Sequence, residues 1–245
     1  MLVGIVGAAF IGAITNRESS KVTRPPTTAP VVFAATSTSR TSGTKTSASS
    51  TTTDRVSTST STATVAAPAS SLLVPLTIST PSHQDTYSRS VDFGGWSDVT
   101  GCQNTRATLL IHTSQVPVTF TTASDCTVKT GWWVDPWSGV TTAAAHDLQI
   151  DHTVPLANAW RSGGWAWSHD QRVAYANDLV DPDHLVPILA HENESKSDDG
   201  PDLWRPPDRT AWCRYAIDWD RIKAKWKLTA TQAEWSALVD MALSC

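Results

Sequence analysis

A carboxylate and an imidazole, Asp151 and His152, stand next to each other at the end of a short apolar, β-branched segment. Residues 149–156 read as a strand that Pro155 ends, because proline cannot donate a ladder hydrogen bond. Successive strand residues point to opposite faces, so the two side chains can serve one site only where the strand ends in a bend. Neutral imidazole is a base near neutral pH, and carboxylate oxygen suits a hard divalent cation. The pair indicates metal-assisted hydrolysis. The alternative is a structural hydrogen-bonding pair.

A second polar cluster follows another apolar segment, residues 185–190. It runs His-Glu-Asn-Glu-Ser-Lys over residues 191–196 and reads as the start of a helix. Two strands and a short helix, with Asn193 on the helix, could form a compact site for a metal and a base. Lys196 lies about one helical turn beyond that asparagine. Lys196 and Arg106 are candidates for contacts with a substrate phosphate, and the alternative for each is a solvated charge or a structural ion pair.

Asp-His-Thr-Val-Pro at 151–155, followed by Asn-Glu-Ser-Lys at 193–196, resembles the Asp-His…Asn-x-x-Lys pattern of the HNH endonucleases. The similarity is closest to secreted members related to the C-terminal domain of GmrSD-type restriction enzymes. Supporting segments lie at 101–106, 160–163, 175–179, 204–207 and 213–216, so the resemblance covers residues 84–245 and is far more specific than an isolated Asp-His pair.

The resemblance implies the ββα-metal fold, with His152 as the general base and with Asp151 and Asn193 as ligands of a divalent ion. Mg²⁺ or Mn²⁺ is the expected ion, and Zn²⁺ is the alternative. Many members carry an asparagine that orients the catalytic imidazole where this chain has His184, so His184 is the expected orienting residue. Gln149 stands where related sequences often carry another acid.

The activity implied is that of a secreted endonuclease that hydrolyses phosphodiester bonds of DNA, with RNA as the alternative substrate, and has little sequence specificity. Nucleic acid is the expected partner, with no obligate protein partner and no stable membrane association after removal of a signal. The twelve Trp residues suggest a second class, a carbohydrate-binding module without catalysis. However, Trp212, Trp219 and Trp226 follow a helical core stripe, so packing explains them better.

Composition divides the chain into three parts. Residues 1–15 are apolar and resemble a signal-peptide core, with a retained anchor as the alternative. Residues 16–81 are rich in Ser, Thr and Pro and are expected to form a disordered linker, because they cannot bury enough apolar surface. Residues 82–245 hold every Trp and Cys and form the expected nuclease domain.

Charge follows the same division. Residues 1–81 have six Lys and Arg against two Asp and Glu, a net charge of +4, whereas residues 82–245 have thirteen against twenty-one, a net charge of −8. An acidic domain disfavours tight, sequence-independent DNA binding. The negative net charge is still compatible with an enzyme that binds phosphate through a metal ion and a local basic patch.

The four cysteines, Cys102, Cys126, Cys213 and Cys245, make no Cys-x-x-Cys zinc pattern. Their even number beside a Ser/Thr-rich segment indicates disulfides and an extracellular location. Sequence allows three pairings, of which local closure favours 102–126 and 213–245. Four buried free thiols in a cytosolic protein are the alternative.

Element patterns predict an α+β domain, an HNH core with added strands and C-terminal helices. Strands are expected at residues 108–112, 116–121 and 126–134, from their β-branched and aromatic residues. Capping boxes at residues 168–171 and 229–232 each predict a helix start. Apolar residues at helical spacing predict a further helix over residues 210–228.

Overall fold

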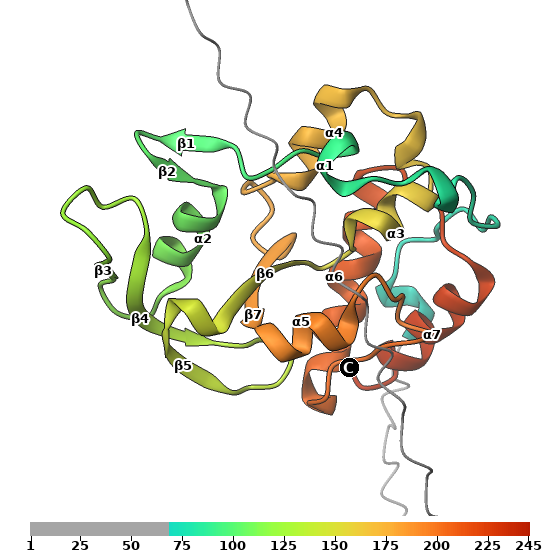
Figure 1. Ribbon diagram of the computed structural model, residues 1–245. Coiled ribbons are helices and arrows are strands. Elements are labelled where there is room, and N and C mark those ends of the chain that lie inside the picture. Colours follow the sequence, from blue (N-terminus) through green and yellow to red (C-terminus); the bar gives the residue numbers. More distant parts are fainter. Residues whose placement is uncertain (1–68) are drawn as a thin grey trace, which may run out of the picture. The chain divides into compact units, whose positions relative to one another are not determined.

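The computed structural model describes residues 69–245 (Figure 1). The signal-like segment 1–15 and the expected disordered linker as far as residue 68 lie outside these residues. The last part of the expected linker contacts the domain. Leu73 is 5% exposed in the core, Val74 N donates to Asp220 Oδ2 at 2.7 Å, and Ile78 bridges Ala230. The folded domain therefore begins before residue 82, and the boundary expected there is wrong by about ten residues of chain.

The described residues form short strands and helices that alternate along the chain. The strands are β1 (Asp98–Thr100), β2 (Gln103–Asn104), β3 (Thr119–Phe120), β4 (Val128–Val134), β5 (Thr141–Ala144), β6 (Leu148–His152) and β7 (Leu185–Leu189). The α-helices are α1 (Arg89–Asp92), α2 (Thr105–Thr113), α3 (Leu156–Arg161), α4 (His169–Ala176), α5 (Ala190–Lys196), α6 (Trp212–Lys225) and α7 (Gln232–Ala242). Short 3-10 turns are η1 (Ala69–Leu72), η2 (Gln84–Thr86), η3 (Ala145–Asp147), η4 (Gly164–Ala166) and η5 (Arg209–Ala211). This mixture confirms the α+β class.

The centre of the domain is the antiparallel pair β6–β7, followed directly by α5. Five residues pair in unbroken register, from Leu148 opposite Leu189 to His152 opposite Leu185. Strand β6 stops at His152, and Pro155 forms the N-cap of α3, so the predicted proline stop is confirmed. In Figure 1, α2 and the β3-β4-β5 sheet lie on one side of β6–β7, and α3, α4, α6 and α7 lie on the other.

The strand predicted over residues 108–112 is wrong, because these residues belong to helix α2. Asn104 caps that helix, and its Oδ1 accepts from Ala107 N at 3.0 Å. An apolar run of three residues does not distinguish a strand from one face of a helix, and the cap decides here. The strand predicted over 116–121 is only β3, whereas the one predicted over 126–134 is confirmed as β4.

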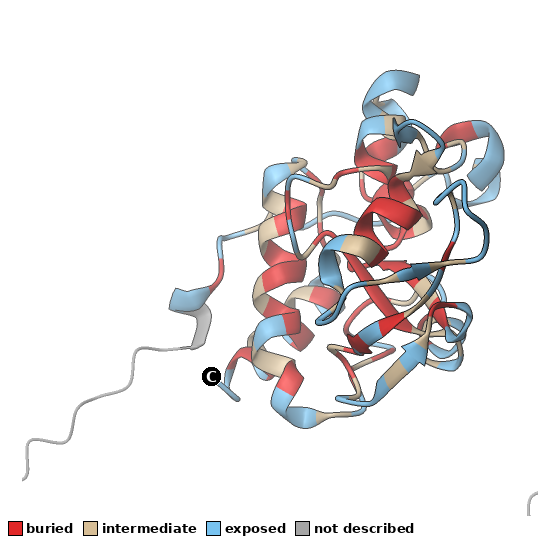
Figure 2. Ribbon diagram, turned by 90° about the vertical axis from the view of Figure 1, so that its left-hand side faces the viewer, coloured by how far each residue is buried: buried red, intermediate tan, exposed pale blue. Residues whose placement is uncertain are grey.

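The predicted helices are confirmed. The predicted box at Ser168 forms, with Gln171 as its partner at the start of α4. The box predicted at 229–232 is wrong by two residues, because Thr231 caps α7 and pairs with Glu234. The helix expected over residues 210–228 is η5 and α6. Figure 2 shows the buried residues of the long helices gathered on the faces that turn toward the domain interior.

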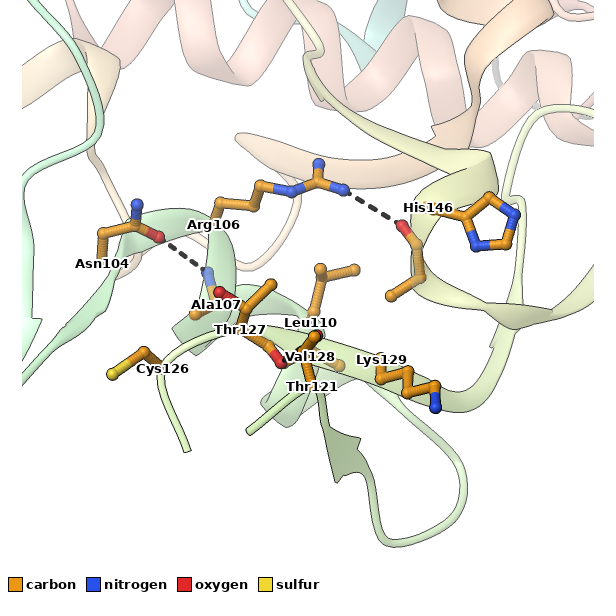
Figure 3. A pocket seen from close by; sticks show the side chains of 11 residues that line it. Asn104, Arg106, Ala107, Leu110, Thr121, Cys126, Thr127, Val128, Lys129 and His146 are labelled. Atoms are coloured by element: carbon orange, nitrogen blue, oxygen red, sulfur yellow. Dashed lines mark hydrogen bonds between the residues drawn. The ribbon is translucent and has the colours of Figure 1, made fainter. Parts of the chain in front are cut away.

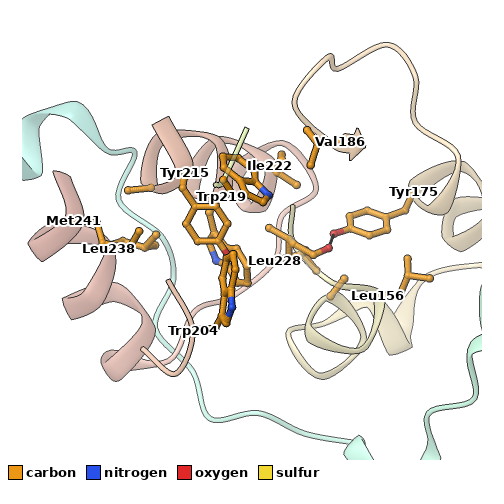
Figure 4. Close-up of a cluster of buried hydrophobic side chains, with 14 of the residues drawn as sticks. Leu156, Tyr175, Val186, Trp204, Tyr215, Trp219, Ile222, Leu228, Leu238 and Met241 are labelled. Atoms are coloured by element: carbon orange, nitrogen blue, oxygen red, sulfur yellow. Dashed lines mark hydrogen bonds between the residues drawn. The ribbon is translucent and has the colours of Figure 1, made fainter. Parts of the chain in front are cut away.

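Two clusters of buried apolar side chains flank the central strands. The larger cluster, shown in part in Figure 4, joins α3, α4, α6 and α7 and includes Leu156, Tyr175, Tyr215, Trp219, Leu238 and Met241. The smaller joins α2, β4, β6 and β7 and includes Leu110, Trp133 and Ile150. Strand β6 contributes to the smaller cluster and β7 to both, so the ends of these strands are held from both sides.

Disulfides join Cys102 to Cys126 and Cys213 to Cys245, and both favoured pairings are confirmed. The second bond fastens the C-terminal residue to α6. Each bond closes a short loop, and loops of this size contribute roughly 3 kcal/mol each to stability.

Candidate functional site

His152, the last residue of β6, has one ring nitrogen committed to the fold and one facing a cleft. Its Nε2 lies 3.0 Å from the backbone oxygen of Ala176, at the end of α4. A carbonyl oxygen only accepts, so Nε2 carries the proton and Nδ1 carries the lone pair. No hydrogen bond within residues 69–245 uses Nδ1, although the ring lines a cleft. The tautomer fixed by the fold therefore presents a basic nitrogen to the cleft.

Aromatic rings hold this imidazole and keep it neutral. Trp96 lies parallel to it at 5.5 Å between centroids, and the Tyr175 ring lies parallel to it at 6.4 Å. Burial lowers the pKa of His152 well below the usual value, and the nearby His184 and Arg89 lower it further, against the opposing effect of the Ala176 hydrogen bond. At neutral pH the ring is thus in the form that can accept a proton.

Asp151, one residue earlier, has a buried partner. Lys196, in the last turn of α5, donates from Nζ to Asp151 Oδ1 at 2.7 Å and Oδ2 at 2.8 Å, and also to the His152 backbone oxygen at 2.9 Å. The exposed fractions of the two side chains are 0% and 3%. Burial raises the pKa of Asp151 and lowers that of Lys196, and each charge partly opposes the effect on the other. The pair fastens α5 to the end of β6.

Asn193, also on α5, lines the same cleft as Asp151 and His152. Its Nδ2 donates to Gln149 Oε1 at 2.6 Å, and its amide oxygen accepts no hydrogen bond from any described residue. Gln149, which stands where an acid was expected, orients Asn193. The amide oxygen is therefore available to a ligand in the cleft.

The residues present fit a hydrated hard cation. A carboxylate has about four lone-pair positions. Lys196 takes one on each oxygen of Asp151 and Trp137 Nε1 approaches Oδ2 at 3.4 Å, which leaves one position on Oδ1. With the Asn193 oxygen this makes two oxygen donors, as Mg²⁺ sites use when water and phosphate complete the shell. Residues 69–245 contain no group of three His, Cys, Asp or Glu side chains placed to hold a metal ion.

The cleft has a volume of about 360 Å³ and is lined by Asp151, His152 and Asn193, together with Tyr87 and Arg89. A smaller hollow of about 70 Å³ continues it past Trp96 and shares Arg89 and His152. Arg89 is exposed, and no hydrogen bond or ion pair in the described part of the chain uses its guanidinium. It lines both hollows together with His152, which places it near the imidazole.

Arg89 is the site residue that sequence reasoning missed. No spacing relates it to Asp151 or Asn193, and only the docking of α1 beside β6 brings it to the cleft. The one available signal is the position of Arg89 in an acidic domain, seven residues before Trp96, and this signal is weak.

Three predicted roles need correction. Lys196 is fully buried on Asp151, so it cannot contact a phosphate in this structure. Arg106 lies away from the cleft and donates from Nη2 to the backbone oxygens of Ala145 and Leu148. His184 does not hydrogen-bond to His152 in the described structure. Its Nε2 lies 2.7 Å from Tyr175 O, next to the carbonyl that holds His152, so it supports the orienting backbone rather than the imidazole.

The fold and the site define a disulfide-bonded α+β protein with a buried ion pair behind a cleft that presents an imidazole. Over 181 residues, 74% of this chain and 86% of the relative, the chain is 40% identical to an "Uncharacterized secreted protein" of Arthroderma benhamiae, and it belongs to the same family. No family model matches the chain, and no solved structure matches it. The protein is secreted, as its two disulfides also indicate. No helix in the described part is long and apolar enough to cross a bilayer.

Proposed function

We propose that this protein is a secreted, metal-dependent endonuclease of the HNH type that hydrolyses phosphodiester bonds with little sequence specificity. The observation that carries the proposal is the orientation of His152. Nε2–H is bound to the Ala176 carbonyl, and Nδ1 is free at a cleft that Asp151 and Asn193 also line. The β6–β7–α5 arrangement supports a ββα-metal core, because it brings these residues, 42 positions apart at most, to one place.

In the proposed reaction, His152 Nδ1 takes a proton from the attacking water. The Ala176 carbonyl keeps the ring in the required tautomer, and the buried surroundings keep it neutral until the proton arrives. A positioned base of this kind accelerates reactions about 10²- to 10⁴-fold.

Asp151 and Asn193 would hold Mg²⁺ or Mn²⁺, with DNA as the main substrate and RNA as the alternative. The ion would supply positive charge to the phosphate and to the leaving oxygen. Lys196 keeps the Asp151 carboxylate in place, and Gln149 does the same for the Asn193 amide. Arg89, with its guanidinium free at the cleft, would bind a non-bridging phosphate oxygen.

The alternative, a carbohydrate-binding module, has less support. Of the twelve Trp side chains, only Trp132 and Trp165 are exposed, and they lie on different elements, β4 and η4. One face of Trp165 is already covered by His83, at 3.8 Å between ring centroids. Residues 69–245 thus present no row of exposed indoles for stacking on a sugar chain.

Incubation of the purified protein with supercoiled plasmid, linear DNA and RNA tests the proposal, with Mg²⁺, with Mn²⁺, and with chelator. We expect nicking that requires one of the ions and stops on chelation. Absence of metal-dependent cleavage of both DNA and RNA under all these conditions would contradict the enzyme proposal. Cleavage that persists in chelator would contradict only the metal requirement.

A further inference from the structure

A second cleft of about 360 Å³ lies away from His152, between the start of α2, strand β4 and turn η3 (Figure 3). Its floor is apolar and is formed by Ala107, Leu110, Val128 and Ala145. Arg106, Lys129 and His146 stand around it, and none of the described lining residues is acidic. The combination of an apolar floor and cationic walls suits an amphipathic anion.

The cations of this cleft are unusual in an acidic domain. Thirteen Lys and Arg side chains lie in residues 69–245, and seven of them form ion pairs with carboxylates. Of the six that remain, Arg106 and Lys129 line this cleft and Arg89 lines the His152 cleft. Half of the cations without a carboxylate partner are therefore gathered at the two clefts.

Arg106 retains hydrogen-bonding capacity toward the cleft. Its Nη2 donates to Ala145 O at 3.1 Å and Leu148 O at 2.8 Å, while no described residue accepts from Nε or Nη1. The two bonds hold the guanidinium plane in place, as a preorganised phosphate contact requires. Lys129 is exposed and forms no ion pair within residues 69–245, and His146 Nε2 lies 3.2 Å from Asp147 Oδ1.

Strand β6 connects the two clefts. Arg106 binds the carbonyl of Leu148 at the start of the strand, and His152 is at its end. Four residue steps span about 13 Å. Phosphates on one strand of a duplex advance about 3.4 Å per nucleotide along the axis, so a nucleic acid strand that reached both clefts would span at least a few nucleotides.

We propose that the cleft between α2, β4 and η3 binds a nucleotide unit, with the phosphate on Arg106 and Lys129 and the base or sugar on the apolar floor. The anionic class of the ligand follows from the lining, and the choice of a nucleotide rests on the proposed endonuclease function. The unit is either part of a bound strand, a few nucleotides from the bond that is cut, or a free mononucleotide.

Equilibrium binding in chelator, where no metal-dependent cleavage occurs, tests the proposal. The probes are labelled single-stranded oligonucleotides of four and twelve residues, and dAMP and inorganic phosphate serve as competitors. The variants are Lys129→Ala and Lys129→Ala/His146→Ala, both at exposed positions. Lys227→Asn is the matched control, because it removes an exposed charge outside both clefts at a φ of 54°, which asparagine tolerates. Arg106 is left unchanged because its carbonyl bonds contribute to the fold.

We expect Lys129→Ala to weaken binding of the twelve-residue oligonucleotide about fivefold and to lower the salt slope by about 0.7, with no change in the control. A Lys129-dependent effect on dAMP competition would identify a free-nucleotide site, whereas an effect confined to the longer probe would identify a strand subsite. Unchanged affinity and salt slope in both cleft variants, or no binding of any probe by the wild type, would overturn the proposal. If the wild type cleaves but the variants bind as the wild type does, the second-cleft proposal fails and the endonuclease proposal stands. If binding depends on Lys129 but no cleavage occurs, the endonuclease proposal fails and the second cleft is still an anion site.

Discussion

Lys196 Nζ lies 2.7 and 2.8 Å from the two carboxylate oxygens of Asp151, and the two side chains are buried together behind the cleft. The same ammonium binds the His152 backbone oxygen at 2.9 Å. Lys196 therefore positions both the carboxylate and the strand end that carries the imidazole. Lys196 therefore has a structural role in the site. A side chain with no solvent exposure cannot contact a substrate directly.

Removal of Lys196 should destabilise the domain severely. Lys196→Met leaves the Asp151 carboxylate buried without its partner, and we expect a loss of about 3 to 5 kcal/mol in the free energy of unfolding by urea denaturation. The double variant Asp151→Leu/Lys196→Met removes both charges and should recover most of that stability without activity. The exposed variant Lys227→Asn is the control for loss of a positive charge. A Lys196→Met protein as stable as the wild type would show that the ion pair does not hold the site.

Arg89 should affect substrate binding rather than folding. Its guanidinium has no partner within residues 69–245, so Arg89→Ala should leave the urea midpoint nearly unchanged. Loss of one phosphate contact should raise KM about tenfold and flatten the salt dependence of cleavage, with Arg89→Lys in between. Arg209→Ala, at an exposed arginine beside Trp212, is the matched control. Equal KM values for the Arg89 variants and the wild type would remove Arg89 from the substrate site.

His184 should make stability depend on pH. Burial lowers its pKa to about 4, below the ordinary 6.5, although Asp178 and Asp181 oppose the shift. Between pH 6.5 and 4, His184 is therefore protonated in the unfolded chain but neutral in the native state. The free energy of unfolding decreases as pH falls through this range. The full effect is on the order of 3 kcal/mol. Compared with wild type in urea titrations at pH 4, 5, 6 and 7, His184→Asn should show a shallower slope. Parallel curves would contradict this assignment.

Asn193 should contribute to metal affinity without contributing to folding. Asn193→Ala removes the amide oxygen that faces the cleft, so calorimetric titration should show weaker Mg²⁺ or Mn²⁺ binding, and high metal concentration should restore part of the activity. Gln149→Ala frees the same amide and should give a milder loss of the same kind. Unchanged metal affinity in Asn193→Ala would exclude this oxygen as a ligand.

The sequence predicts the helices and strands of this domain better than it predicts the tertiary contacts between them. Pro155 and the capping residue Ser168 fix element ends through local chemistry, so the end of β6 and the start of α4 follow from nearby residues. The last helix also follows, but its cap is Thr231, two residues after the predicted Thr229. The strand predicted over residues 108–112 is wrong because three apolar residues suit a strand and a helix alike, and the cap at Asn104 makes them helical.

The site was predicted only in part, for a related reason. Burial of Lys196 depends on a carboxylate 45 residues away, and the position of Arg89 depends on how α1 docks. Both are tertiary properties that spacing along the chain does not record. The tautomer of His152 likewise depends on the Ala176 carbonyl, a backbone group that no side-chain pattern identifies.

Single-turnover cleavage by His152→Ala, measured beside its metal affinity, tests the central claim most directly. The claim is that Nδ1 of His152 takes the proton from the attacking water. Near-ultraviolet circular dichroism must first show that the variant is folded, with His169→Ala, an exposed histidine away from the cleft, as the control. In the wild type, the pKa of His152 lies well below 6.5, so the rate should be flat above pH 6.5 and fall only at lower pH. We predict a rate loss of about 10²- to 10⁴-fold in His152→Ala, metal affinity close to that of the wild type, and partial rescue by added imidazole. A folded variant that cleaves at the wild-type rate, or one that binds metal tenfold more weakly, would contradict the role of His152 as the base.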